Sequence, residues 1–238
     1  MPVIDLDKYS PLLFSGLPSI EDAATQFEAF GGLARIEAAL GTVARKHPAA
    51  AFGCGLQLLH RHSDLDPDEI MVGFGSTTMP VKRSELAQSS LCKLRPTIWG
   101  LRPGSQIDFV PLEFAMFDDA STTKVELDPE FARDVAKVLV DFELEQTLGL
   151  AILPEAGEAF VVNLEATYGR ANVVVPANLF AEQQDSIEAL WDLVALGHAD
   201  RLRATCRVKC MRDPQDRKHY CLGHRQSELQ NVLVQLCV

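Results

Sequence analysis

Two histidines close to an apolar segment are the residues best suited to metal binding or proton transfer. His60 and His62 end the segment 49–62, which we predict to be a strand, so both imidazoles should point to the same face. Neutral imidazoles bind Zn, Fe or Ni and also act as acids and bases near neutral pH. We therefore predict His60 and His62 as catalytic residues or metal ligands. The alternative is structural, with His60 buried and hydrogen-bonded and His62 at the surface.

Glu113 interrupts an otherwise apolar strand that we predict over residues 107–117. Burial disfavours the charged form of a carboxyl group and raises its pKa, which suits a general acid or base near neutral pH. We predict Glu113 as a third catalytic residue. Pro111 favours the alternative, an edge strand with Glu113 in water. If the site is catalytic, Glu113 and at least one of the two histidines should line the same pocket.

A predicted hairpin carries a further group of polar side chains. Its strands, 159–166 and 171–176, flank a tight connection and can gather Glu165, Arg170 and Asn172 into one patch. We predict these three residues as substrate-binding. Arg170 can pair with Glu165, or with a substrate carboxylate through two parallel hydrogen bonds. The alternative is an ordinary solvent-facing sheet surface.

The C-terminal region contains four residues of metal-binding type. Cys206, Cys210, Cys221 and His224 follow the spacing C-x3-C-x10-C-x2-H, which could close a structural zinc site. On a continuous strand, Cys206 and Cys210 would lie about 13 Å apart, so the strand would have to bend. The alternatives are small buried apolar side chains, or a Cys221 nucleophile beside a histidine. The sequence assigns no cofactor, and zinc is the candidate ion for this group.

Local signals define the elements that must position these residues. Ser19 and Asp128 are predicted helix caps, Pro129 suits a first helical position, and a capping box begins a helix at Asp185. Residues 1–18 are expected to form an extended arm. Further strands are predicted at 69–74, 95–101, 149–153, 202–211 and 217–222.

Strands come in runs between helices instead of alternating with them. This order favours α+β over a doubly wound parallel sheet. We predict one α+β domain over residues 1–238, with an antiparallel or mixed sheet and packed helices.

Composition narrows the class of protein. Acidic residues number 33 and basic residues 22, for a net charge of -11, which argues against general nucleic-acid binding. Hydrophobic residues make up 47%, enough to exclude a disordered chain. The 6 cysteines, without a secretory signal or an apolar membrane segment, are expected to be thiols of a soluble cytoplasmic protein.

Three stretches together resemble an uncharacterised group of fungal single-domain proteins. They are LLHRHSDLDPDE (58–69), PLEF (111–114) and LEATYGRANV (164–173). The resemblance covers the middle two-thirds of the chain. It implies a soluble fungal protein, with a role in secondary metabolism or no known role, and it assigns no activity to any residue.

Two functions of different classes follow from these candidates. The first is a small-molecule enzyme whose site is built from sheet residues. Its reaction would be of acid–base type (a lyase, isomerase or hydrolase), because the sequence has no dinucleotide or P-loop motif that would indicate a redox cofactor or a nucleotide. The second is a non-catalytic interaction module with a C-terminal structural zinc site. In either case we expect that the chain does not bind a membrane, and the sequence is compatible with a homo-oligomer.

Overall fold

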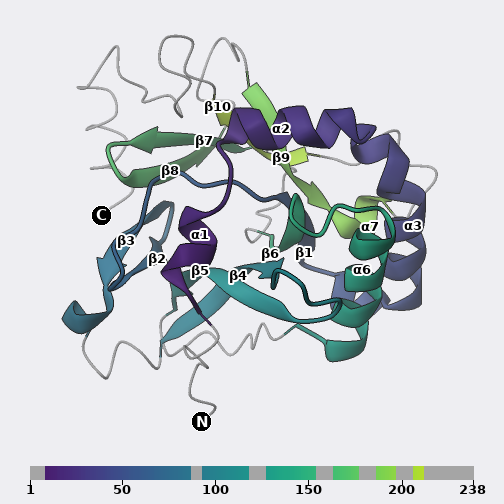
Figure 1. The fold of residues 1–238 in the computed structure, drawn as a ribbon, viewed down its shortest axis with the longest axis horizontal. Coiled ribbons are helices and arrows are strands. Elements are labelled where there is room, and N and C mark those ends of the chain that lie inside the picture. The colour runs from purple at the N-terminus through teal and green to yellow at the C-terminus, as the bar shows by residue number, and fades with distance from the viewer. Residues whose placement is uncertain are drawn as a thin grey trace.

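Ten strands close into one barrel in a computed structural model of the chain (Figure 1). The structure describes residues 9–86, 93–117, 127–153, 163–176, 186–196 and 206–211. The strands are β1 (Cys54–Leu58), β2 (Glu69–Phe74), β3 (Thr77–Lys82), β4 (Leu94–Leu101), β5 (Phe109–Met116), β6 (Leu148–Ile152), β7 (Asn163–Tyr168), β8 (Ala171–Pro176), β9 (Ser186–Asp192) and β10 (Cys206–Met211). The helices are α1 (Pro11–Ser15), α2 (Ile20–Ala29), α3 (Gly32–Lys46), α4 (Pro48–Ala51), α6 (Pro129–Asp141) and α7 (Leu193–Leu196), with a 3-10 turn, η2 (Arg83–Glu85).

The barrel order is β1-β6-β4-β5-β2-β3-β8-β7-β10-β9, and β9 pairs with β1 to close it. Two neighbouring pairs are parallel, β2 with β5 and β7 with β10, and the other pairs are antiparallel. The predicted α+β domain, a sheet with packed helices, is therefore wrong. Closure depends on pairing between segments far apart in the chain, such as β1 and β9, and local sequence patterns do not report such pairing.

Several predicted element boundaries are confirmed. The Ser19 hydroxyl accepts a hydrogen bond from the Asp22 amide, and α2 begins at Ile20, directly after this cap. The Asp128 carboxylate accepts from the amides of Glu130 and Phe131 at the start of α6. Strand β2 has the predicted bounds, and β4, β5, β6 and β8 lie at or within two residues of theirs.

The predicted helix after Asp185 is wrong, because residues 186–192 form strand β9. This strand lies between β1 and β10 and hydrogen-bonds to both, which replaces the helical hydrogen bonds. The helix is confined to α7, which Asp192 caps by accepting from the amides of Val194 and Ala195. Asp185 and residues 217–222 lie outside the described residues.

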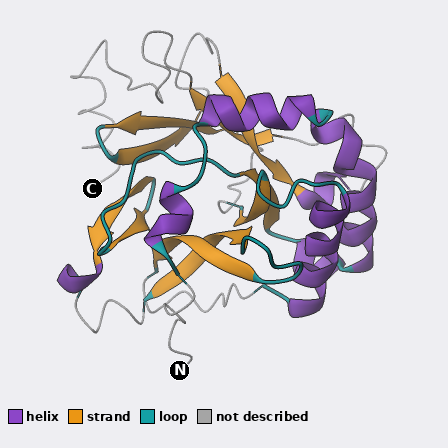
Figure 2. Cartoon of the chain, in the orientation of Figure 1, coloured by secondary structure: helices purple, strands orange, loops and turns teal. Residues whose placement is uncertain are grey.

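Part of the predicted extended arm is helical. Pro11 begins α1, and the Phe14 side chain is fully buried. It packs with Leu59, Met71 and Leu112. Figure 2 shows α1 apart from the group of helices α2, α3, α6 and α7. Residues 1–8 lie outside the described part of the chain.

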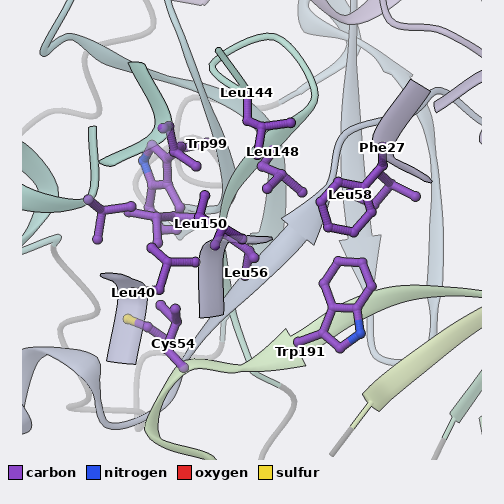
Figure 3. Close-up of a cluster of buried hydrophobic side chains, with 14 of the residues drawn as sticks. Phe27, Leu40, Cys54, Leu56, Leu58, Trp99, Leu144, Leu148, Leu150 and Trp191 are labelled. Atoms are coloured by element: carbon purple, nitrogen blue, oxygen red, sulfur yellow. The ribbon is translucent and has the colours of Figure 1, made fainter. Parts of the chain in front are cut away.

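The largest apolar core lies between that group of helices and strands β1, β6 and β9. Figure 3 shows its centre, where Phe27 and Leu40 of the helices lie near Leu56, Leu58 and Trp191 of the strands. Full burial of one such side chain contributes about 1.5–3 kcal/mol. Side chains of β1 are buried in this core, which fixes the position of the strand, and His60 follows two residues after the end of β1. Within the described residues, no helix has the length and apolar character to cross a bilayer.

Candidate metal centre

Three potential ligands converge in the described part of the structure: His60, His62 and Glu165. Their ligand atoms all lie within 4.8 Å of one another. The Nε2 atoms of His60 and His62 are 3.9 and 3.6 Å from Oε2 of Glu165. The histidine side chains are 1% and 4% exposed, and the Glu165 side chain 14%. Residues that the sequence placed in two separate sites therefore form one cluster.

The histidines follow β1 instead of ending it. Strand β1 stops at Leu58, so the predicted strand over 49–62 is too long at both ends. The Arg61 amide donates to the Pro18 carbonyl, which anchors the backbone between the two histidines. Their rings meet edge to face with centroids 4.7 Å apart. The expectation that both imidazoles point the same way is met, although strand alternation is not the cause.

Hydrogen bonds select the same tautomer for both histidines. Nδ1 of His60 lies 2.7 Å from the Leu58 carbonyl oxygen, which only accepts, so Nδ1 carries the proton. Nε2 of His62 lies 3.2 Å from the amide nitrogen of Asn172, which only donates. Nδ1 of His62 is 3.4 Å from the Thr167 hydroxyl. Both Nε2 atoms are thus unprotonated, as metal ligation requires, and an ion bound to Nε2 of His62 would replace the hydrogen bond from Asn172.

Burial keeps both rings in the neutral form. It lowers the pKa of His60, although the charge of Glu165 opposes this effect. The pKa of His62 is well below its usual value because of burial and, second, because His60 lies beside it. Neutral imidazole is the form that binds a metal ion.

Glu113 lies on the wall of a small cavity that also includes both histidines, so the structural condition for a catalytic site is met. The cavity has room for about one water molecule. Its lining combines polar and apolar side chains: Gln57, His60, His62, Glu113 and Glu165, and Phe14, Leu17, Leu59, Ile98 and Leu112. Burial and, second, the charge of Glu165 raise the pKa of Glu113 to about 8.

Asn172 lies behind the ligands. Its side-chain amide donates to Oε1 of Glu165, which orients that carboxylate, and to Nε2 of His62, the nitrogen that would bind the ion. Its Oδ1 atom is buried and has no hydrogen-bond partner in the described structure. The sequence analysis did not single out Gln57, which lines the cavity. It could have been found, because it is the one polar side chain within the apolar strand β1.

The chain matches no known family. No family model fits it, and no similar curated protein or solved structure was found. The resemblance to fungal proteins therefore stays a prediction. The donor geometry alone decides which function we propose.

Arg170 pairs with Glu69, so the expected pairing with Glu165 is wrong. Its Nη1 and Nη2 atoms donate to the two carboxylate oxygens of Glu69 at 2.9 and 2.5 Å. Nη2 also donates to the Asp64 carbonyl at 2.6 Å. These bonds tie the β7–β8 turn to the loop that follows His62. A role of Arg170 in substrate binding stays a prediction.

Arg170→Ala should lower the free energy of unfolding by about 1–3 kcal/mol, because the buried Glu69 carboxylate loses its two-pronged partner. Arg170→Lys should restore only part of this loss. Urea denaturation measures the effect. Lys137→Ala is the matched control: it removes an exposed pair with Asp141 and should cost less than about 0.5 kcal/mol. Equal losses in both variants would contradict the anchoring role of Arg170.

The predicted C-terminal zinc site is only partly described. Cys206 and Cys210 lie on β10, whereas Cys221 and His224 lie outside the described residues. Sγ of Cys210 is 2.9 Å from Oε2 of Glu165 and 3.3 Å from Nε2 of His60. Cys210 is thus next to the histidine cluster.

Proposed function

We propose that the chain is a metal-dependent enzyme that acts on a small molecule by acid–base chemistry, of the lyase, isomerase or hydrolase type. The observation that carries the proposal is the convergence of His60, His62 and Glu165 within 4.8 Å. Two histidines and one glutamate hold zinc in hydrolytic enzymes and leave a position for water or substrate. The neutral rings and their common tautomer support the same assignment.

In this proposal, each cavity residue has a distinct role. His60, His62 and Glu165 would hold the ion, and a bound zinc ion would supply a water whose pKa is lowered toward neutrality. Glu113 transfers the proton, because a carboxyl group with a pKa of about 8 exchanges protons readily near neutral pH. Asn172 would orient Glu165 through Oε1, the carboxylate oxygen other than the one nearest the histidines.

A cytoplasmic location and a role in secondary metabolism remain parts of the proposal. Neither Cys54 nor Cys210 is in a disulfide. Thiols of this kind are typical of a reducing compartment, which supports the first of these two points.

Metal analysis tests the binding site. Purified chain, loaded with zinc and dialysed, should retain about one ion per chain. His60→Ala, His62→Ala and Glu165→Gln should each weaken zinc binding at least about 100-fold, since losing a ligand costs more than losing a residue that orients one. His47→Ala is the control, because His47 contacts Asp134, away from the cluster. Zinc binding that survives all three ligand changes would contradict the site.

A second measurement separates an enzyme from an interaction module. With Co(II) in place of zinc, a catalytic site has an exchangeable position, whereas a structural site is closed. Added azide should therefore change the visible spectrum of the bound cobalt. An unchanged spectrum at saturating azide would contradict the enzyme and favour the interaction module.

A further inference from the structure

We infer that Cys210 is a fourth ligand of this metal centre, so that the centre contains a thiolate and selects zinc over harder divalent ions. The inference rests on the proposed function, because it requires that His60, His62 and Glu165 bind an ion. It also separates Cys210 from the C-terminal ligand set in which the sequence placed it.

One of the two printed distances from Cys210 fits the spacing between ligands of one ion, and the other is shorter. Two donors bound to the same zinc ion at about 2.0–2.3 Å in a tetrahedron lie roughly 3.3–3.8 Å apart. Sγ of Cys210 is 3.3 Å from Nε2 of His60 and 2.9 Å from Oε2 of Glu165. The corresponding distances of His62 and His60 from Glu165 are 3.6 and 3.9 Å. The distance to His60 already suits a shared ion, and a shift of about half an ångström would bring the distance to Glu165 into this range. Cys210 does not belong to the group whose ligand atoms all lie within 4.8 Å of one another, so its sulfur would also have to move toward His62 when the ion binds.

Backbone pairing places Cys210 here independently of its side-chain conformation. Strand β10 runs parallel to β7, and Cys210 is the register partner of Glu165. On its other side, β10 pairs with β9, where Cys210 is opposite Ile187. Because β10 is hydrogen-bonded on both edges, Cys210 cannot move away from Glu165 without breaking the barrel.

A buried cysteine is often only a small apolar side chain, but the surroundings of Cys210 are polar. Its thiol donates to the Glu165 carboxylate. Close by, Oδ1 of Asn172 is a buried acceptor without a partner in the described structure, on a residue only 1% exposed. A water bound to the ion as a fifth ligand would be able to donate the hydrogen bond that Oδ1 of Asn172 lacks.

Ligation changes the state of Cys210 and the preference for metals. When the sulfur–metal bond forms, the S–H bond breaks and its proton passes to the buffer. Thiolate and imidazole favour zinc and cobalt, whereas magnesium and manganese favour oxygen ligands. Substrate or water then binds as a fifth ligand, an expansion that zinc permits.

Cobalt spectroscopy on the full chain tests the inference. Co(II) bound to the parent should give a near-ultraviolet sulfur-to-cobalt charge-transfer band along with its visible bands. Cys210→Ser should lose the charge-transfer band and keep bound cobalt. Its preference for zinc over manganese should fall at least about 10-fold. Cys54→Ser is the matched control, because Cys54 is a buried cysteine on β1 that packs in the apolar core, and it should keep the band.

Each other outcome contradicts a specific statement. Visible cobalt bands without the charge-transfer band in the parent would overturn thiolate ligation and leave the proposed function intact. A band that persists in Cys210→Ser would assign the sulfur to another cysteine. No cobalt binding by the parent would contradict the proposed function itself. If Cys210→Ser fails to fold, cadmium NMR of the parent decides, since a sulfur ligand shifts the resonance strongly downfield.

Discussion

Phe14→Ala should lower the free energy of unfolding by about 3–5 kcal/mol, the usual cost of removing a fully buried aromatic ring. The Phe14 side chain has no exposed surface and packs against Leu59, Met71 and Leu112. It also lines the cavity that contains the histidines. Truncation therefore loses apolar burial and leaves a larger hollow beside the proposed metal centre. Urea denaturation of the metal-free protein measures the loss.

The same short helix provides the control. Leu12 is 79% exposed, and Leu12→Ala should change stability by less than about 0.5 kcal/mol. Because the new hollow is partly apolar, benzene should bind to Phe14→Ala and recover some of its stability. If Phe14→Ala and Leu12→Ala behave alike, then α1 does not dock on the barrel through Phe14.

Glu113→Gln should remove a contribution of Glu113 that lowers the stability of the parent as the pH rises from about 5 to 8. In the unfolded chain this carboxyl group ionises near 4.5, whereas in the folded protein its pKa is about 8. Between these values the native state holds one more proton than the unfolded state, so stability falls with rising pH. The slope of this contribution approaches about 1.4 kcal/mol per pH unit. Glutamine cannot ionise, so the variant should become the more stable protein by several kcal/mol at pH 8.

Urea denaturation across this pH range, with metal removed by chelation, measures the difference between the variant and the parent. Glu37 is exposed on α3, and Glu37→Gln should leave the pH dependence of the parent unchanged. The burial that raises the pKa of Glu113 is the cause of the effect, with the charge of Glu165 second. Parallel pH profiles for the parent and Glu113→Gln would show that Glu113 is solvated and would remove its assignment as the proton-transfer group.

The candidate site was predictable residue by residue but not as one cluster. Histidine, glutamate and cysteine stand out because each interrupts or follows an apolar segment, as His60, Glu113 and Glu165 do. We predicted them in separate sites, because local sequence patterns do not tell how far apart β1, β7 and β10 lie in the folded protein. The sequence offered Glu165 or a substrate carboxylate as partners of Arg170, whereas both terminal nitrogens of Arg170 donate to Glu69 at the start of β2.

The fold divides in the same way. Caps at Ser19 and Asp128 act within one helical turn, so the chain itself reports where α2 and α6 begin. The segment 186–192 has helical-looking apolar spacing, and it becomes a strand because β1 and β10 supply hydrogen bonds on both edges. The intrinsic preference of these residues for a helix contributes less free energy than the strand hydrogen bonds and the burial of side chains that comes with them.

The order of amino acids by itself determined the helix caps, most strands and the identity of the ionisable groups, because these depend on neighbours a few residues away. Only the tertiary structure decided that the strands close into a barrel and that His60, His62, Glu165 and Cys210 meet beside Glu113. The physical reason is range, because side-chain contacts in the folded protein join residues as far as 150 positions apart in the sequence. The closed barrel and the cluster are therefore properties of the folded chain, not of any segment.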